Sequence, residues 1–135
     1  MSKHKCRTYF LILGDFDAKE LLRRMGIKNA EATNRGEPHG RRGAISSTSR
    51  LEIGYNGEYD PDISVMIRKT ISELLPFAGG MARLKEELGL EYYLETVAEI
   101  EGASDEPKPI LSLDDDIIEF LYITKTKHDL DYYIY

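Results

Sequence analysis

Four glutamates on one side of a predicted strand are the residues best placed to do chemistry in this chain. Glu91, Glu95, Glu99 and Glu101 occupy odd positions of the segment 90–101, and alternate side chains of a strand point to the same side. An unpaired carboxylate is costly to bury, so this side is expected to face solvent or a basic partner. These carboxylates suit ionic binding to a positively charged group. Acid–base catalysis would require carboxyls in distinct environments, and a high density of charge alone does not create them.

The end of the chain repeats this alternation. Asp129, Asp131 and Tyr133 share one side of a predicted terminal strand. The tyrosines of this strand suit an interaction surface or the edge of a core.

The net charge of -6 is unevenly distributed along the chain. Residues 1–90 carry 15 Lys/Arg against 12 Asp/Glu, and residues 91–135 carry 3 against 12. This C-terminal third is expected to repel nucleic acid and to attract basic proteins, although the same charges also serve ordinary solubility.

A basic, glycine-rich connection supplies a second candidate site. Residues 28–49 are predicted to form one long loop, and loops of this length are often functional or mobile. Within it, Arg41, Arg42 and Ser47 could hold an anion through guanidinium and hydroxyl donors. A flexible, solvated loop explains the same residues. The alternative function is therefore a small anionic-ligand binder, or an enzyme, that uses residues 35–50.

The other reactive side chains lack the spacing of a catalytic or metal site. His4, His39 and His128 are far apart, and Asp114–Asp116 lacks the glycine and downstream glutamate of a calcium loop. Cys6 is the only cysteine, and no neighbouring base is indicated that would activate it. We predict no metal, no cofactor and no catalytic residue.

Length and composition are typical of a globular protein. The 135 residues are 41% hydrophobic and 31% charged, which predicts one α+β domain, residues 1–135, with a sizeable core. No apolar run approaches the length of a membrane span, and the N-terminus does not resemble a secretory leader. A single cysteine suits the reducing cytoplasm. The sequence pI of about 5.1 argues against nucleic-acid binding.

Strands and helices alternate along the chain. Strands are predicted over 7–13, 50–55, 90–101 and 129–135. Two strand–acidic turn–helix units, at 9–27 and at 109–123, are each followed by a later strand. This pattern predicts an α+β fold with a mostly antiparallel sheet and helices packed on one face, ferredoxin-like or related.

Cap residues predict where the helices begin and end. Asp17, Asp60 and Ser112 each precede a helical stretch and are typical N-caps. Gly26 is a typical C-terminal stop, and Pro76 is expected to end the longest helix.

The N-terminal segment resembles a known family. The run Tyr9–Asp17, followed by Met25-Gly26-Ile27, is similar to the N-terminal signature of a bacterial family designated domain of unknown function 4279. Later landmarks also look similar, so the resemblance covers nearly the whole chain: Leu74-Leu75-Pro76, Ile110-Leu111-Ser112 and the closing Asp129-Leu130-Asp131 with Tyr133. The family often carries a Trp in the second strand, near Leu51, and this chain has no Trp. The resemblance implies an α+β fold and supplies no catalytic residue.

The first functional hypothesis is a non-enzymatic protein-binding module of the bacterial cytoplasm. It would be inhibitor or immunity-like, by analogy with other small bacterial families. Its acidic side would dock on a basic protein, with no role for nucleic acid or membranes. The chain would be a monomer, or a homodimer that pairs through the terminal strand. The expected partner-binding residues are Glu91, Glu95, Glu99, Glu101, Asp129, Asp131 and Tyr133.

Overall fold

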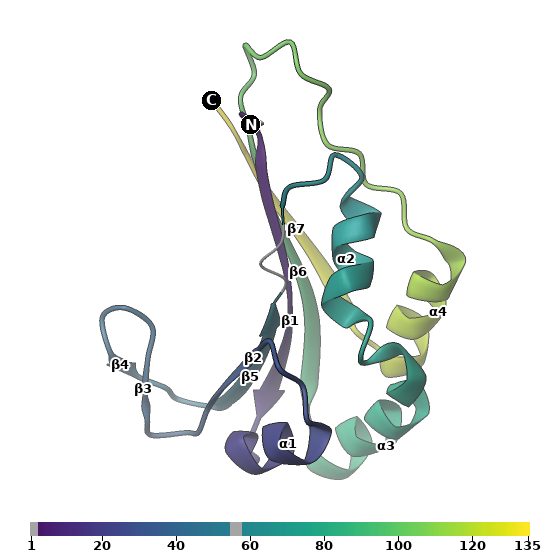
Figure 1. Ribbon diagram of the computed structural model, residues 1–135. Coiled ribbons are helices and arrows are strands. Elements are labelled where there is room, and N and C mark those ends of the chain that lie inside the picture. Colours follow the sequence, from purple (N-terminus) through teal and green to yellow (C-terminus); the bar gives the residue numbers. More distant parts are fainter. Residues whose placement is uncertain (1–2, 55–57) are drawn as a thin grey trace.

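A five-stranded sheet forms the centre of the molecule, and the helices lie on one side of it (Figure 1). The computed structural model describes residues 3–54 and 58–135. The strand order is β2-β5-β1-β6-β7. Its strands are β1 (Lys5–Gly14), β2 (Ala30–Thr33), β5 (Ser49–Gly54), β6 (Glu91–Ile100) and β7 (Lys127–Ile134). Only β6 and β7 run parallel; the other neighbours are antiparallel. The predicted α+β class with a mostly antiparallel sheet is confirmed.

Four α-helices and a short 3-10 helix complete the fold. They are α1 (Ala18–Met25), α2 (Ile63–Ile71), η1 (Leu75–Phe77), α3 (Ala78–Leu88) and α4 (Asp115–Thr124). The apolar core lies between these helices and the sheet, and it includes the fully buried Phe10 of β1, Leu94 of β6, Ile67 of α2 and Ile117 of α4. No helix among the described residues is long and apolar enough to span a membrane.

The two sides of the sheet differ in chemistry. Most even-numbered residues of β1 and β6, such as Ile12 and Tyr92, are buried beneath the helices. Odd-numbered residues of β1, β6 and β7 point to the opposite side, which no described helix covers (Figure 1). We call this side the open face. Alternation along each strand therefore places the acidic side chains of β6 outside the core.

The predicted loop 28–49 is the largest error in the sequence-based assignment. It contains β2, which pairs with β5 at one edge of the sheet. It also contains β3 (Pro38–His39) and β4 (Ala44–Ile45), which pair as a two-stranded arm that projects from the sheet (Figure 1). The sequence of β2, Ala-Glu-Ala-Thr, has weak strand propensity, so pairing with β5 decides its structure.

The second predicted strand–helix–strand unit is also corrected. Residues 109–111 do not join the sheet; Ile110 makes only an isolated bridge to Asp62. The unit is instead β6–α4–β7, a crossover between parallel neighbours. Lys125 and Thr126 alone separate α4 from β7, and Lys125 adopts a left-handed φ of 53°.

The predicted helix starts are confirmed at one of three positions. Asp17 caps α1, because its Oδ1 accepts the Glu20 N–H at 3.0 Å. The predictions that Asp60 and Ser112 are N-caps were wrong. Helix α2 is capped by Asp62. The N-cap of α4 is Asp114, which makes no side-chain cap bond.

The predicted helix ends have a mixed outcome. Gly26 ends α1 with a φ of 66°. Pro76 does not end a long helix, because α2 already stops at Ile71 and Pro76 lies within η1. Tyr55, the predicted last residue of the second strand, is outside the described residues.

Candidate functional site

Strand pairing makes five of the seven predicted partner-binding residues neighbours of one another on the open face. Glu95 lies directly beside Asp129, and Glu99 lies beside Tyr133. Asp131 lies between Asp129 and Tyr133 on the same side of β7. Neighbouring strands are about 4.8 Å apart, so these side chains form one continuous group. We call them the acidic cluster.

The other two predicted residues do not join the acidic cluster. Glu91 is at the opposite end of β6, where its carboxylate accepts the Tyr93 hydroxyl at 3.0 Å. Glu101 follows the last residue of β6, and its backbone N–H donates to His4 Nδ1 at 3.1 Å. The candidate surface is therefore shorter along β6 than the sequence predicted.

The acidic cluster is accessible to solvent. Asp131 and Tyr133 are exposed, whereas Glu95, Glu99 and Asp129 are half-buried. Within the described part of the chain, no basic side-chain nitrogen lies within 4.0 Å of these carboxylates. The cluster thus keeps its negative charge available to another molecule.

Crowding changes the protonation of the acidic cluster. Burial raises the pKa of Glu95 to about 7, and a hydrogen bond with Asp129 and the charges of Asp129 and Asp131 add to this effect. The positive charge of Lys127 acts in the opposite direction. Neighbouring carboxyls resist ionising together, so near neutral pH Glu95 keeps its proton in a large share of molecules. A cation placed beside the pair would displace that proton.

Two cations on β1 flank the acidic cluster, and the sequence analysis missed both. Lys5 lies opposite Glu99, and Arg7 lies opposite Val97 with its guanidinium carbon 5.4 Å from the centre of the Tyr9 ring. With Glu95, Glu99 and Asp131 they line a hollow of about 510 Å³ on the open face. The alternation of Lys5, Arg7 and Tyr9 was visible in the sequence, but the pairing of β1 with β6 was not. Charge therefore changes sign across the hollow, from basic at β1 to acidic at β7.

The alternative anion site lies on the arm. Arg41 and Arg42 occupy the turn between β3 and β4, and Ser47 follows β4; all three are exposed. None of them lines the hollow on the open face. The arm projects away from the helices (Figure 1). The structure thus places these donors on a projecting turn, apart from the acidic cluster.

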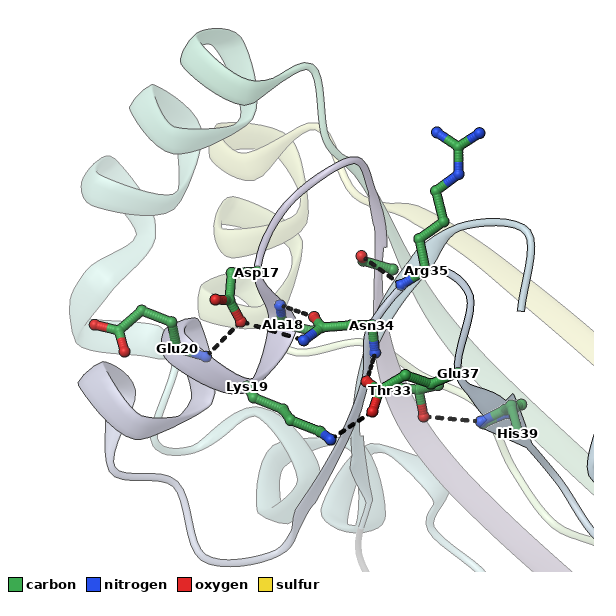
Figure 2. Close-up of polar contacts among 10 residues, drawn as sticks. Asp17, Ala18, Lys19, Glu20, Thr33, Asn34, Arg35, Glu37 and His39 are labelled. Atoms are coloured by element: carbon green, nitrogen blue, oxygen red, sulfur yellow. Dashed lines mark hydrogen bonds and ion pairs between the residues drawn. The ribbon is translucent and has the colours of Figure 1, made fainter. Parts of the chain in front are cut away.

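The start of α1 is bound by side chains from its own surroundings. Figure 2 shows Asn34 Oδ1 accepting the Ala18 N–H, at 2.7 Å, beside the Asp17 cap on the Glu20 N–H. The Asn34 amide also donates to Asp17 Oδ1 at 3.4 Å. Because side chains already take these first-turn donors, this helix start does not offer them to a phosphate.

The same network fixes the base of the arm. Glu37 Oε1 accepts the Asn34 N–H at 2.7 Å, and Glu37 Oε2 pairs with Lys19 of α1 at 2.6 Å (Figure 2). His39 Nδ1 lies 3.2 Å from the Thr33 hydroxyl at the end of β2. These polar residues position the arm relative to α1, which is a structural role.

Two reactive side chains outside the acidic cluster are Cys6 and His128. Burial raises the pKa of the Cys6 thiol to about 11, so the thiol is a poor nucleophile at neutral pH. His128 bonds the Thr96 hydroxyl at 3.1 Å on the helix side of the sheet, away from the acidic cluster. Within residues 3–54 and 58–135 no three His, Cys, Asp or Glu side chains are grouped to hold a metal ion.

Comparison with known proteins places the chain in a family but assigns no activity. No curated protein and no solved structure matches the chain. A family model does match, over residues 4–135, which is nearly the whole sequence. The resemblance at Tyr9–Asp17 is therefore part of a match that extends through the acidic cluster. The chain belongs to the family described as domain of unknown function, DUF4279.

Proposed function

We propose that this protein is a non-enzymatic binding module, inhibitor or immunity-like, whose acidic cluster docks on a basic protein. One observation carries the proposal: adjacent carboxylates on β6 and β7 lie on the uncovered side of the sheet, and no described basic side chain lies within 4.0 Å of them. Glu95 and Asp129 are direct neighbours in this group. A basic partner would relieve their repulsion, which Lys127 offsets only in part in the isolated protein.

The acidic cluster would act mainly on the rate and selectivity of association. Exposed ion pairs contribute only about 0.2–1 kcal/mol each, whereas complementary fields accelerate encounter and disfavour partners of like charge. Affinity then depends on desolvated contacts within the cluster. Tyr133 is 52% exposed and Val97 is half-buried between the acidic positions, so both are available for such contacts.

Reversal of charge on the open face tests the proposal. We expect wild-type protein, immobilised and exposed to lysate of its native host, to retain a basic protein in stoichiometric amount. Glu95→Lys combined with Glu99→Lys should abolish this retention, and so should raising the salt to about 0.5 M, where the Debye length falls to roughly 4 Å.

A matched control separates the site from overall charge. Glu86 and Glu87 are exposed on α3, so Glu86→Lys with Glu87→Lys makes the same change in net charge elsewhere. This control should retain the partner. Equal retention by wild type and by the Glu95/Glu99 variant at both salt concentrations would rule out docking through the acidic cluster.

We also propose that β2, β5, β1 and β6 form a ferredoxin-like unit to which α4 and β7 are added. The order of these strands and their antiparallel directions support this assignment. The connections support it too, because α1 links β1 to β2 and helices α2 and α3 link β5 to β6. A crystal structure in which either connection is left-handed would contradict it.

A further inference from the structure

The outer edge of β7 is uncovered over the length of the strand. β7 is the last strand of the sheet and has β6 as its one neighbour among the described strands. Every second residue of a paired strand directs its N–H and C=O away from its neighbour. The eight residues of β7 therefore present a row of free backbone groups, whereas the opposite edge strand, β2, has four residues.

The side chains of β7 present different chemistry on its two sides. Asp129 and Asp131 point to the open face, next to Glu95. The helix side of β7 carries large apolar side chains that the core leaves exposed, at 44%, 58% and 65%: Leu130, Tyr132 and Ile134. A ligand strand beside β7 would meet Lys127, the two carboxylates and Tyr133 on one side and apolar groups on the other.

We propose that β7 binds its partner by strand addition, and that the bound segment of the partner is an extended one that alternates basic and apolar residues. This inference rests on the proposed function and specifies the partner's chemistry. Cross-strand neighbours share a side of the sheet, so the basic residues of the segment lie beside Asp129 and Asp131. Its apolar residues lie beside Leu130 and Tyr132. Backbone hydrogen bonds hold the segment, and the alternating side chains select it.

Charge disfavours a second copy of this chain at the edge in the two registers that oppose the aspartates. An antiparallel pair of β7 strands centred on Leu130 places Asp129 opposite the Asp131 of the other copy. A pair centred on Asp131 places that residue opposite itself. Like charges directly opposed across strands are destabilising, and charged residues on an edge strand are a common protection against self-pairing. The same carboxylates favour a basic strand.

The protonation of Glu95 supplies an independent signal of this binding. The pKa of Glu95 is raised to about 7 by burial and by its acidic neighbours. A lysine placed beside Asp129 lowers that pKa, because an opposite charge favours the ionised carboxyl. Binding of the segment near pH 7 is therefore accompanied by release of a fraction of a proton per molecule.

Synthetic peptides test the inference directly. The probe is a capped heptapeptide that alternates four lysines with three valines; the control has the same composition with its lysines and valines in two blocks. We expect the probe to bind at least about tenfold more tightly than the control, as measured by calorimetry in two buffers of different ionisation enthalpy. We also expect proton release, and slower hydrogen exchange at alternate amides of β7.

Peptide backbone modification separates strand addition from simple attraction of charge. N-methylation at every second residue of the probe should weaken binding by at least about tenfold, whereas N-methylation of the intervening residues should have little effect. Asp129→Asn with Asp131→Asn should weaken binding, and the matched Glu86→Gln with Glu87→Gln should not. Thermal melts verify that each variant is folded.

The outcomes distinguish this inference from the proposed function. If probe and control bind equally and N-methylation has no effect, the acidic cluster attracts basic molecules without strand addition; the proposed function stands and this inference fails. If neither peptide binds and the host partner is also not retained, both fail. If light scattering shows a dimer that Leu130→Pro dissociates, a second copy occupies the edge and the inference is overturned.

Discussion

At the scale of single residues, Glu95 makes stability depend on pH. Its pKa in the folded protein rises from an ordinary 4.5 to about 7, so the fold favours the protonated carboxyl. Its contribution to stability is complete below about pH 4.5 and is lost as the pH rises through about 7.

Glu95→Gln mimics the protonated state at every pH. Relative to wild type, we expect a gain of about 1 kcal/mol in unfolding free energy at about pH 8.5, limited by solvent screening, and no gain at about pH 4. Urea denaturation at the two pH values measures this difference. Glu119→Gln, at an exposed position of α4, is the control and should show no pH-dependent gain. A gain for Glu95→Gln that is equal at both pH values would contradict the prediction.

Cys6 should be chemically inert in the folded protein. Because burial raises the pKa of its thiol to about 11, we expect alkylation at about pH 7.5 to be at least about 100-fold slower than in the urea-unfolded chain. Mass spectrometry of iodoacetamide-treated samples measures both rates. Rapid labelling of the native protein would show that the thiol is activated.

The acidic residues of the site could be predicted from the sequence, but their neighbourhood could not. Alternation alone placed Glu95 and Glu99 on one side of a strand, and it did the same for Asp129 and Asp131. The register between β6 and β7 is set by the length of the crossover through α4 and by core packing, which no local pattern encodes. That register is what excludes Glu91 from the acidic cluster.

At the scale of elements, a charged clamp joins α2 to α4. Arg68 pairs with Asp114 and Asp116 at 2.6 Å each, at the start of α4. These aspartates lie at the start of α4, and Arg68 is their specific partner.

Removal of the clamp should loosen the start of α4. We expect Arg68→Met to lower the urea midpoint of unfolding at low salt and to lower it less at about 1 M NaCl, because both pairs are exposed and salt screens them. Urea denaturation at the two salt concentrations measures the change. Arg83→Met, at an exposed position of α3, serves as the control. Equal losses in the two variants would mean that the clamp contributes nothing.

The predicted elements are most accurate where local chemistry is strong. The Asp17 cap and the Gly26 stop bound α1 as expected, because each satisfies backbone groups within one turn. β2 was missed because its short, alanine-rich sequence becomes a strand only beside β5. Ile110 was assigned to a strand, but after Pro107 and Pro109 it forms just one isolated bridge.

At the scale of the whole molecule, folding brings the charge gradient of the sequence onto one surface. The acidic C-terminal third does not form a separate tail, since β6 lies directly between the basic end of β1 and the acidic β7. The basic arm projects near the opposite edge of the sheet (Figure 1). The sequence revealed how lopsided the charge is, but its spatial arrangement depends on the order of the strands.

This distribution predicts a monomer at neutral pH. We expect light scattering to give a mass close to 15.4 kDa at concentrations up to about 100 µM, since the net charge and the carboxylates of β7 oppose self-association. Asp129→Asn with Asp131→Asn should shift the protein toward dimers. A wild-type dimer that resists high salt would show that another surface mediates association.

The short connection of Lys125 and Thr126 between α4 and β7 has a further consequence. One inserted residue there would rotate the whole strand by half a turn of its pleat, so that Asp129 and Asp131 would point toward the helices and Tyr132 toward the water. The open face would lose its carboxylates although no side chain had been replaced. The acidic cluster therefore depends on the length of this turn as much as on the acidic residues. Insertions in the turn should be far less tolerated than insertions in the projecting arm.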